Sequence, residues 1–285
     1  MGDQLKTEGS EGNSSGWRRA RWWVGAGLAV VVAVIVVFAV AQGGGSGGGP
    51  LNAIAKAAEV TQREPGGRAV IEATVDNTTT PEGISETGSL IFDDSGMSRG
   101  VMTIKGKSTG REVKALVIAK GTTSYTSSEA FESLPEGKKW MEIDIRPGAG
   151  EADSSSASAG SPKEGLKLLE GVQDAEEVGK EDVRGVPTTH YRGTLPTPEE
   201  VFGVKVHVSA LHVDVWIDAQ DRVRRMQVTY TTAVDGTEDA TTTTEMDIDY
   251  VSFGRVPKIK LPNPDEVFNA TSEIEANAQS AVEGG

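Results

Sequence analysis

The three histidines of the chain are the side chains best suited to bind a metal or to transfer a proton near neutral pH. They are His190, His207 and His212. The last two lie five residues apart in a stretch predicted to be a strand, where successive side chains point to opposite faces of the sheet. Their side chains would therefore point away from each other, which does not suit two ligands of one metal. We expect the histidines to face solvent or to line turns, and we predict no metal site.

Acidic and serine residues offer no catalytic arrangement either. Ser154–Ser156 form a low-complexity tract and not the G-x-S-x-G turn that presents a nucleophilic serine. Asp247 and Asp249 alternate with apolar residues, which indicates the solvated face of a strand and not a carboxylate pair for acid–base catalysis. The segment 218–221 lacks the glycine and the closing glutamate of a calcium loop, and we interpret it as a hairpin turn. We predict no catalytic residue, no cofactor and no enzymatic activity.

The composition excludes further classes of chemistry and of partner. The chain has no cysteine, so it has no disulfide, no thiolate metal site and no thiol nucleophile. Its formal net charge of −14 repels phosphate backbones, and we expect no nucleic-acid partner. Apolar residues make up 37% of the 285 residues, which is enough to build a buried core.

One N-terminal segment is apolar enough to cross a membrane. Residues 22–41 carry no charge and, as a helix, would span about 30 Å. Arginines at positions 18, 19 and 21 precede this segment and glycines follow it, so the positive-inside rule predicts a cytoplasmic N-terminus and an extracytoplasmic C-terminal part. We favour an uncleaved signal anchor in the cell membrane. The alternative is a signal peptide that is cleaved after the A-x-A sequence at residues 39–41.

The neighbouring segments complete the predicted domain organisation. Residues 1–21 are polar and predicted to be disordered in the cytoplasm, and residues 42–50 form a glycine-rich linker. Residues 51–285 form the extracytoplasmic domain. This domain opens with a predicted helix, in which four apolar residues recur at helical spacing, namely Leu51, Ile54, Ala55 and Ala58.

After residue 67 the apolar residues recur with a period of two, which is typical of half-buried strands. The alternating runs are Ile71–Val75, Leu90–Phe92, Met102–Ile104, Val113–Ala119, Met141–Ile145, Leu211–Ile217, Met226–Tyr230 and Met246–Tyr250. Turn residues separate these runs, as at 93–96, 120–121, 135–137, 218–221 and 235–236. The pattern predicts one large antiparallel sheet.

Three later helix starts share one signature, a capping side chain followed by proline and then glutamate. They begin at Ser161, Thr197 and Asn263. After the first start, Leu166, Leu169 and Val172 would form a helix face. Residues 147–161 are low in complexity and are predicted to be a mobile loop. Helices inserted among hairpins, without β–α–β alternation, predict an α+β domain with helices on one face of the sheet.

Several short motifs, taken in order, are similar to those of a known family. They are Tyr125, Leu134–Lys138, Trp140, Asp182–Tyr191, Val215–Asp218, Arg222–Arg225, Tyr250, Phe253–Gly254, Val256, Ile259 and Pro262. This order resembles the LppX/LprG-type bacterial lipoproteins, whose fold is related to that of the lipoprotein carrier LolA, over most of residues 51–268. One departure is the missing lipobox cysteine, so the apolar helix would replace the lipid anchor.

The resemblance implies a strongly curved antiparallel sheet, a half-barrel, with helices on its concave face. It also implies an apolar cavity that holds the acyl chains of a lipid, glycolipid or lipoprotein during transport, and no enzymatic activity. Strand parity and the covering helix supply the candidate lining residues, which are Met102, Ile104, Leu116, Ile118, Met141, Ile143, Leu166, Leu169, Val215, Ile217, Met226 and Val228. The alternative function is a non-enzymatic module that senses or contacts the cell wall or an unnamed protein partner.

Overall fold

The computed structural model describes residues 49–78, 83–131, 134–144, 161–197, 200–201, 204–234 and 241–272. The predicted N-terminus, the apolar segment 22–41, most of the linker and the loop at 147–160 lie outside these ranges. Within the described ranges, no helix is both long enough and apolar enough to span a bilayer. The membrane anchor therefore stays a prediction.

The first described element is helix α2 (Pro50–Gln62), as predicted, with proline in its first turn. Its buried face consists of Ile54, Ala57, Ala58 and Thr61, whereas Ala55, which was assigned to this face, is exposed. The Thr61 hydroxyl donates to the carbonyl of Ala57 and accepts from the backbone N–H of Val223 at 2.8 Å. The last turn of α2 is thus bonded directly to the sheet.

One curved sheet of 13 strands contains all strands of the described residues. Its first half is a run of consecutive hairpins. The strands are β1 (Gly66–Asn77), β2 (Ile84–Asp93), β3 (Ser98–Gly106), β4 (Glu112–Lys120), β5 (Thr123–Ser127) and β6 (Trp140–Asp144). A short C-terminal strand, β13 (Val267–Asn269), pairs with β6 in parallel at the outer edge.

The second half of the sheet is again antiparallel, in the order β7-β8-β10-β11-β12. Its strands are β7 (Gln173–Val183), β8 (Val186–Thr194), β10 (Val204–Asp218), β11 (Val223–Val234) and β12 (Thr241–Phe253), with β9 (Glu200–Val201) paired to β10. Periodicity had not indicated β7, because this edge strand is mostly exposed and charged and lacks apolar alternation.

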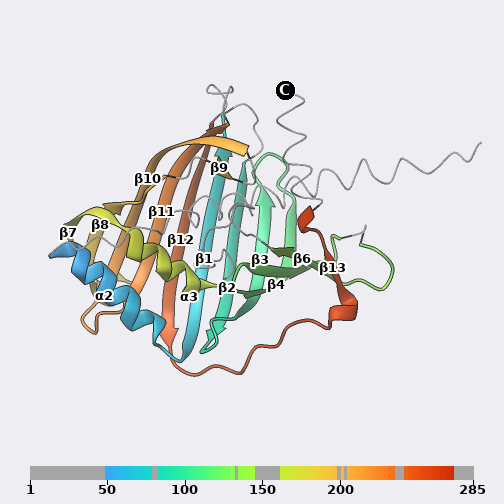
Figure 1. The fold of residues 1–285 in the computed structure, drawn as a ribbon, viewed down its shortest axis with the longest axis horizontal. Coiled ribbons are helices and arrows are strands. Elements are labelled where there is room, and N and C mark those ends of the chain that lie inside the picture. The colour runs from blue at the N-terminus through green and yellow to red at the C-terminus, as the bar shows by residue number, and fades with distance from the viewer. Residues whose placement is uncertain are drawn as a thin grey trace, which may run out of the picture.

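The two halves meet where β1 pairs with β12, over residues 67–77 and 242–253. Helix α2 and the pair α3 (Pro162–Gly165) and η1 (Leu166–Gly171) lie against the same side of the sheet, which curves around them (Figure 1). We name this side the inner face and the opposite side the outer face. The observed curved antiparallel sheet with few helices agrees with the predicted α+β class.

The three later helix starts had different outcomes. The Ser161 hydroxyl accepts from the backbone N–H of Lys163 and caps α3, as predicted, although only one turn of α-helix forms before the chain tightens into η1. The helix predicted after Thr197 is wrong, because Glu200 and Val201 form β9 and pair with β10. Asn263 caps a single 3-10 turn, η2 (Pro264–Glu266), and the chain then extends into β13.

The turn after β10 is confirmed and is held by the buried carboxylate of Asp218. One of its oxygens accepts from the backbone N–H groups of Gln220 and Arg222, and the other is bonded by the side chains of Arg222 and Arg224. Burial raises the pKa of Asp218, but these hydrogen bonds outweigh it and the net pKa is lowered. The segment is therefore a hairpin turn and not a calcium loop.

The histidines require two corrections. His190 does not face solvent: it is buried on the outer face, stacked on Trp216 at 4.2 Å, with Nε2 2.5 Å from an Asp214 oxygen. His207 and His212 do not point to opposite faces. A bulge shifts the register of β10 between Ser209 and His212. Because of this shift His212 lies on the same face as His207, and both side chains are exposed.

Asp249 is likewise buried on the outer face and not solvated as expected. Its carboxylate accepts from Arg225 Nε at 2.6 Å and from Arg184 Nε at 2.7 Å. Burial raises the pKa of Asp249, but the bonds from Arg225 and then Arg184 outweigh it and lower the net pKa. These bonds tie the β7–β8 turn to β11 and β12.

The inner-face core yields a stability prediction. Leu168 is 0% exposed beneath the sheet, whereas Leu261 is 39% exposed. Leu168→Ala should lower the free energy of unfolding by about 2–5 kcal/mol, because it leaves a cavity in a packed core. The matched change Leu261→Ala should cost less than about 0.5 kcal/mol. Urea unfolding followed by tryptophan fluorescence measures both, and equal losses would contradict the assigned core.

The Asp249 ion pairs yield a pH prediction. The folded-state pKa of Asp249 is lowered, so its stabilising contribution is present above the unfolded pKa of about 3.9 and is lost as pH falls through the folded value. Asp249→Asn should therefore cost about 1–3 kcal/mol at pH 7 and should reduce the further loss of stability on acidification. Asp182→Asn, at an exposed position of β7, should change neither. A wild-type acid response in the Asp249 variant would refute the assignment.

Candidate ligand-binding face

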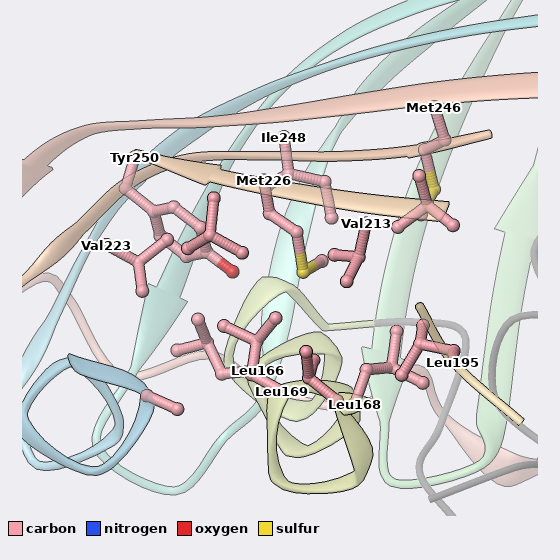
Figure 2. Close-up of a cluster of buried hydrophobic side chains, with 14 of the residues drawn as sticks. Leu166, Leu168, Leu169, Leu195, Val213, Val223, Met226, Met246, Ile248 and Tyr250 are labelled. Atoms are coloured by element: carbon pink, nitrogen blue, oxygen red, sulfur yellow. The ribbon is translucent and has the colours of Figure 1, made fainter. Parts of the chain in front are cut away.

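The inner face has a packed part and an open part. Figure 2 shows Leu166, Leu168 and Leu169 of η1 directed at Val213, Met226 and Ile248 of the sheet. All six side chains are almost completely buried, in one cluster that also includes Ile54 and Ala57 of α2. The packed part, beneath the helices and over β10 to β12, is therefore a filled core.

The open part is the inner face of β3, β4 and β6, which stands clear of α2 and α3 (Figure 1). Strand register places on it a set of half-buried apolar side chains, namely Met102, Ile104, Val113, Val117 and Met141. Glycines interrupt this surface. The Met102 sulfur lies over Gly88, where an added Cβ would come within 2.0 Å of it. The two methionines have flexible side chains, so they allow this surface to adapt to an apolar guest.

One buried carboxyl group lies next to this apolar surface, on the inner face of the neighbouring strand β2. Glu86 of β2 lies on the inner face between Ala73 of β1 and Ile104 of β3. It is 5% exposed, and its Oε1 atom has no hydrogen-bond partner. Burial raises the pKa of Glu86 to about 8, so the group is mostly uncharged at neutral pH. Sequence reasoning missed it, although it has the same parity as Leu90 and Phe92, which were recognised as an alternating run.

The twelve predicted lining residues do not all share one face. Eight lie on the inner face of the sheet and two, Leu166 and Leu169, lie opposite on η1. Of the sheet residues, Met102, Ile104 and Met141 are half-buried in the open part, Ile143 beside them is buried, and Val215, Ile217, Met226 and Val228 belong to the packed part. The last two, Leu116 and Ile118, lie on the outer face.

The pairing register of β3 with β4 explains why Leu116 and Ile118 lie on the outer face and not on the predicted one. In the pairing of β3 with β4, Met102 lies opposite Ala115 and Val101 lies opposite Leu116. The even-numbered residues of β3 therefore lie on the inner face, whereas the even-numbered residues of β4 lie on the outer face. Ile118 packs with Met97 and Ile259 in a separate outer cluster. The alternation of residues within one strand cannot show which face they occupy, because the pairing offset between neighbouring strands decides which residues of the two strands lie on the same face. The β4 residues of the inner face are Val113, Ala115, Val117 and Ala119.

A cavity of about 260 Å³ lies on the outer face. Charged and polar side chains form most of its wall, which consists of Val70, Glu72, Arg184, Arg225, Gln227, Asp247 and Asp249. Asp249 is already paired with both arginines, and Asp247, whose pKa is raised by burial, accepts from Gln227. Among the described residues no group of three or more potential metal ligands is assembled. This cavity suits water or a polar group and not an acyl chain.

The chain is similar to several known proteins. It is 28% identical over 115 residues to a 31.2 kDa Streptomyces griseus protein encoded in the rplA–rplJ intergenic region, covering 33% of this chain and 38% of that protein. It is 26% identical over 151 residues to a Streptomyces coelicolor protein named as a lipoprotein, SCO4650, covering 47% and 48% of the two chains. The chain thus spans less than half the length of these curated relatives.

Among solved structures, the lipoprotein LppX of Mycobacterium tuberculosis aligns with 74% of this chain and 97% of its own, at 15% identity and a TM-score of 0.40. The family relationship rests on sequence. The profile of the LppX_LprAFG lipoproteins matches residues 53–249, from α2 into β12, which is more than half of the chain. The chain therefore belongs to the LppX_LprAFG lipoprotein family.

Proposed function

We propose that this protein is membrane-anchored and extracytoplasmic, and that it binds the acyl chains of a lipid, glycolipid or lipoprotein and aids their transport. The observation that carries the proposal is the open part of the inner face, where half-buried apolar side chains continue from a packed core. Membership in a lipoprotein family supports it. The proposed anchor is the uncharged segment 22–41.

The energetics suit reversible binding. Moving a sixteen-carbon chain from water onto an apolar surface gains about 12 kcal/mol, at about 0.8 kcal/mol for each buried CH₂. A bilayer offers nearly the same gain, so exchange between the membrane and this face is close to neutral. A protein held beside the membrane can then load and release an acyl chain without an external energy source.

A second candidate is a module that contacts the cell wall or a partner protein without carrying lipid. The packing beneath the helices favours it, since Leu166, Met226 and Val228 fill that space with no room for a ligand. The two candidates make opposite predictions about bound lipid.

Two neighbouring residues of β4 provide a matched test. Val117 is half-buried on the inner face opposite Gly100, and Leu116 is half-buried on the outer face opposite Val101. Val117→Trp should occupy the proposed binding surface and reduce bound lipid at least several-fold, whereas Leu116→Trp should leave it unchanged. Val228 is unsuitable for this test, because it is fully buried and tryptophan there would overpack the core.

Native mass spectrometry of the full chain, released from detergent after incubation with a bacterial lipid extract, counts the bound lipid. Thermal unfolding of each variant shows whether the fold is kept. Lipid on the wild type and on the Leu116 variant, with little on the Val117 variant, supports the proposal. A wild type that carries no lipid would favour the interaction module. Equal lipid binding by both variants would contradict the open part of the inner face as the binding surface.

A further inference from the structure

Glu86 differs from the other buried carboxylates of the described residues. Asp93 accepts from the backbone N–H groups of Ser95, Met97 and Ile259, and Asp214, Asp218 and Asp249 are each bonded by arginine or histidine. Glu86 has none of these bonds, and Oε1 is fully buried without a partner. An unpaired buried polar atom lowers stability, because water is removed and nothing replaces it.

The position of Glu86 argues against a purely structural role. Its cross-strand neighbours on the inner face, Ala73 and Ile104, are apolar, and the next inner positions on β2 are Ile84 and Gly88. An aliphatic side chain of similar size would suit these surroundings better. Buried groups that destabilise the fold are characteristic of functional sites. The group is also uncharged at neutral pH, since burial raises its pKa to about 8, so it can both donate and accept a hydrogen bond.

We propose that Glu86 is the polar anchor of the ligand site, where its carboxyl group hydrogen-bonds an uncharged oxygen of the acylated ligand, an ester carbonyl or a hydroxyl. This inference rests on the proposed function and specifies the ligand class. A ligand that presents such an oxygen gives Oε1 its partner, whereas a pure hydrocarbon leaves it unpaired. Sites built to bond an oxygen discriminate strongly against ligands that lack it.

Three probes of equal chain length test the anchor, namely methyl laurate, dodecanol and dodecane. The full-length wild type should bind the ester and the alcohol at least about tenfold more tightly than the alkane, as measured by competition in native mass spectrometry. Glu86→Gln keeps a donor and an acceptor and should retain this preference. Glu86→Leu should still bind all three probes but without preference, and its melting temperature should rise, because the unpaired oxygen is gone.

A control and the contrary outcomes complete the test. Thr87→Leu, at the exposed neighbouring position on the outer face, should leave the preference unchanged. Binding of all three probes by the wild type without preference would overturn the anchor but keep the acyl-binding function. A preference that survives in Glu86→Leu would likewise overturn it. Failure of the wild type to bind any probe would overturn the proposed function together with the anchor.

Discussion

The long-range pairing of β1 with β12 sets the geometry of both halves of the sheet. It joins residues 67–77 to residues 242–253 and makes one sheet of two hairpin runs. Side chains alternate between the two faces along every strand. The register of β1 against β12 therefore fixes which side chains of one half lie on the same face as the helix-facing side chains of the other half. The positions of the helices depend on this pairing, because hydrogen bonds join them to strands next to it. Tyr250 of β12 donates to the Pro162 carbonyl of α3 at 2.6 Å, and Thr61 of α2 accepts from Val223 beside it.

The packed part of the inner face stabilises the fold, whereas the open part is the proposed ligand site. Beneath the helices, leucines of η1 interlock with Val213, Met226 and Val228, and this close packing stabilises the fold. Over β3, β4 and β6, Ala115, Ala119 and Ile143 are buried. The half-buried apolar side chains beside them form the surface that we propose for the ligand, namely Met102, Ile104, Val113, Val117 and Met141. A site next to a rigid core can hold an adaptable ligand without loss of the fold, which is the arrangement that a reversible acyl binder requires.

The outer face satisfies its buried charges internally. His190 lies between Trp216, Asp214 and Glu181, and Asp249 lies between Arg184 and Arg225. The first group links β7, β8 and β10, and the second links the β7–β8 turn and β11 to β12, on the side away from the helices. Glu86 differs from these carboxylates, because its Oε1 atom has no hydrogen-bond partner. Among the described residues the other buried carboxylates are all paired, whereas Glu86 is unpaired on the apolar inner face, which is the face of the proposed ligand.

Local patterns in the sequence were sufficient to predict helix α2, the cap at Ser161, the turn at Asp218 and the parity of most strands, because each of these features depends on neighbours within a few residues. Which residues of neighbouring strands lie on the same face of the sheet became clear from the three-dimensional fold alone. The β3–β4 offset moved Leu116 and Ile118 to the outer face, a bulge brought His207 and His212 to one side, and long-range pairing buried Glu86 and His190. Register and burial are set by partners far away in the chain, so no local pattern of residues encodes them.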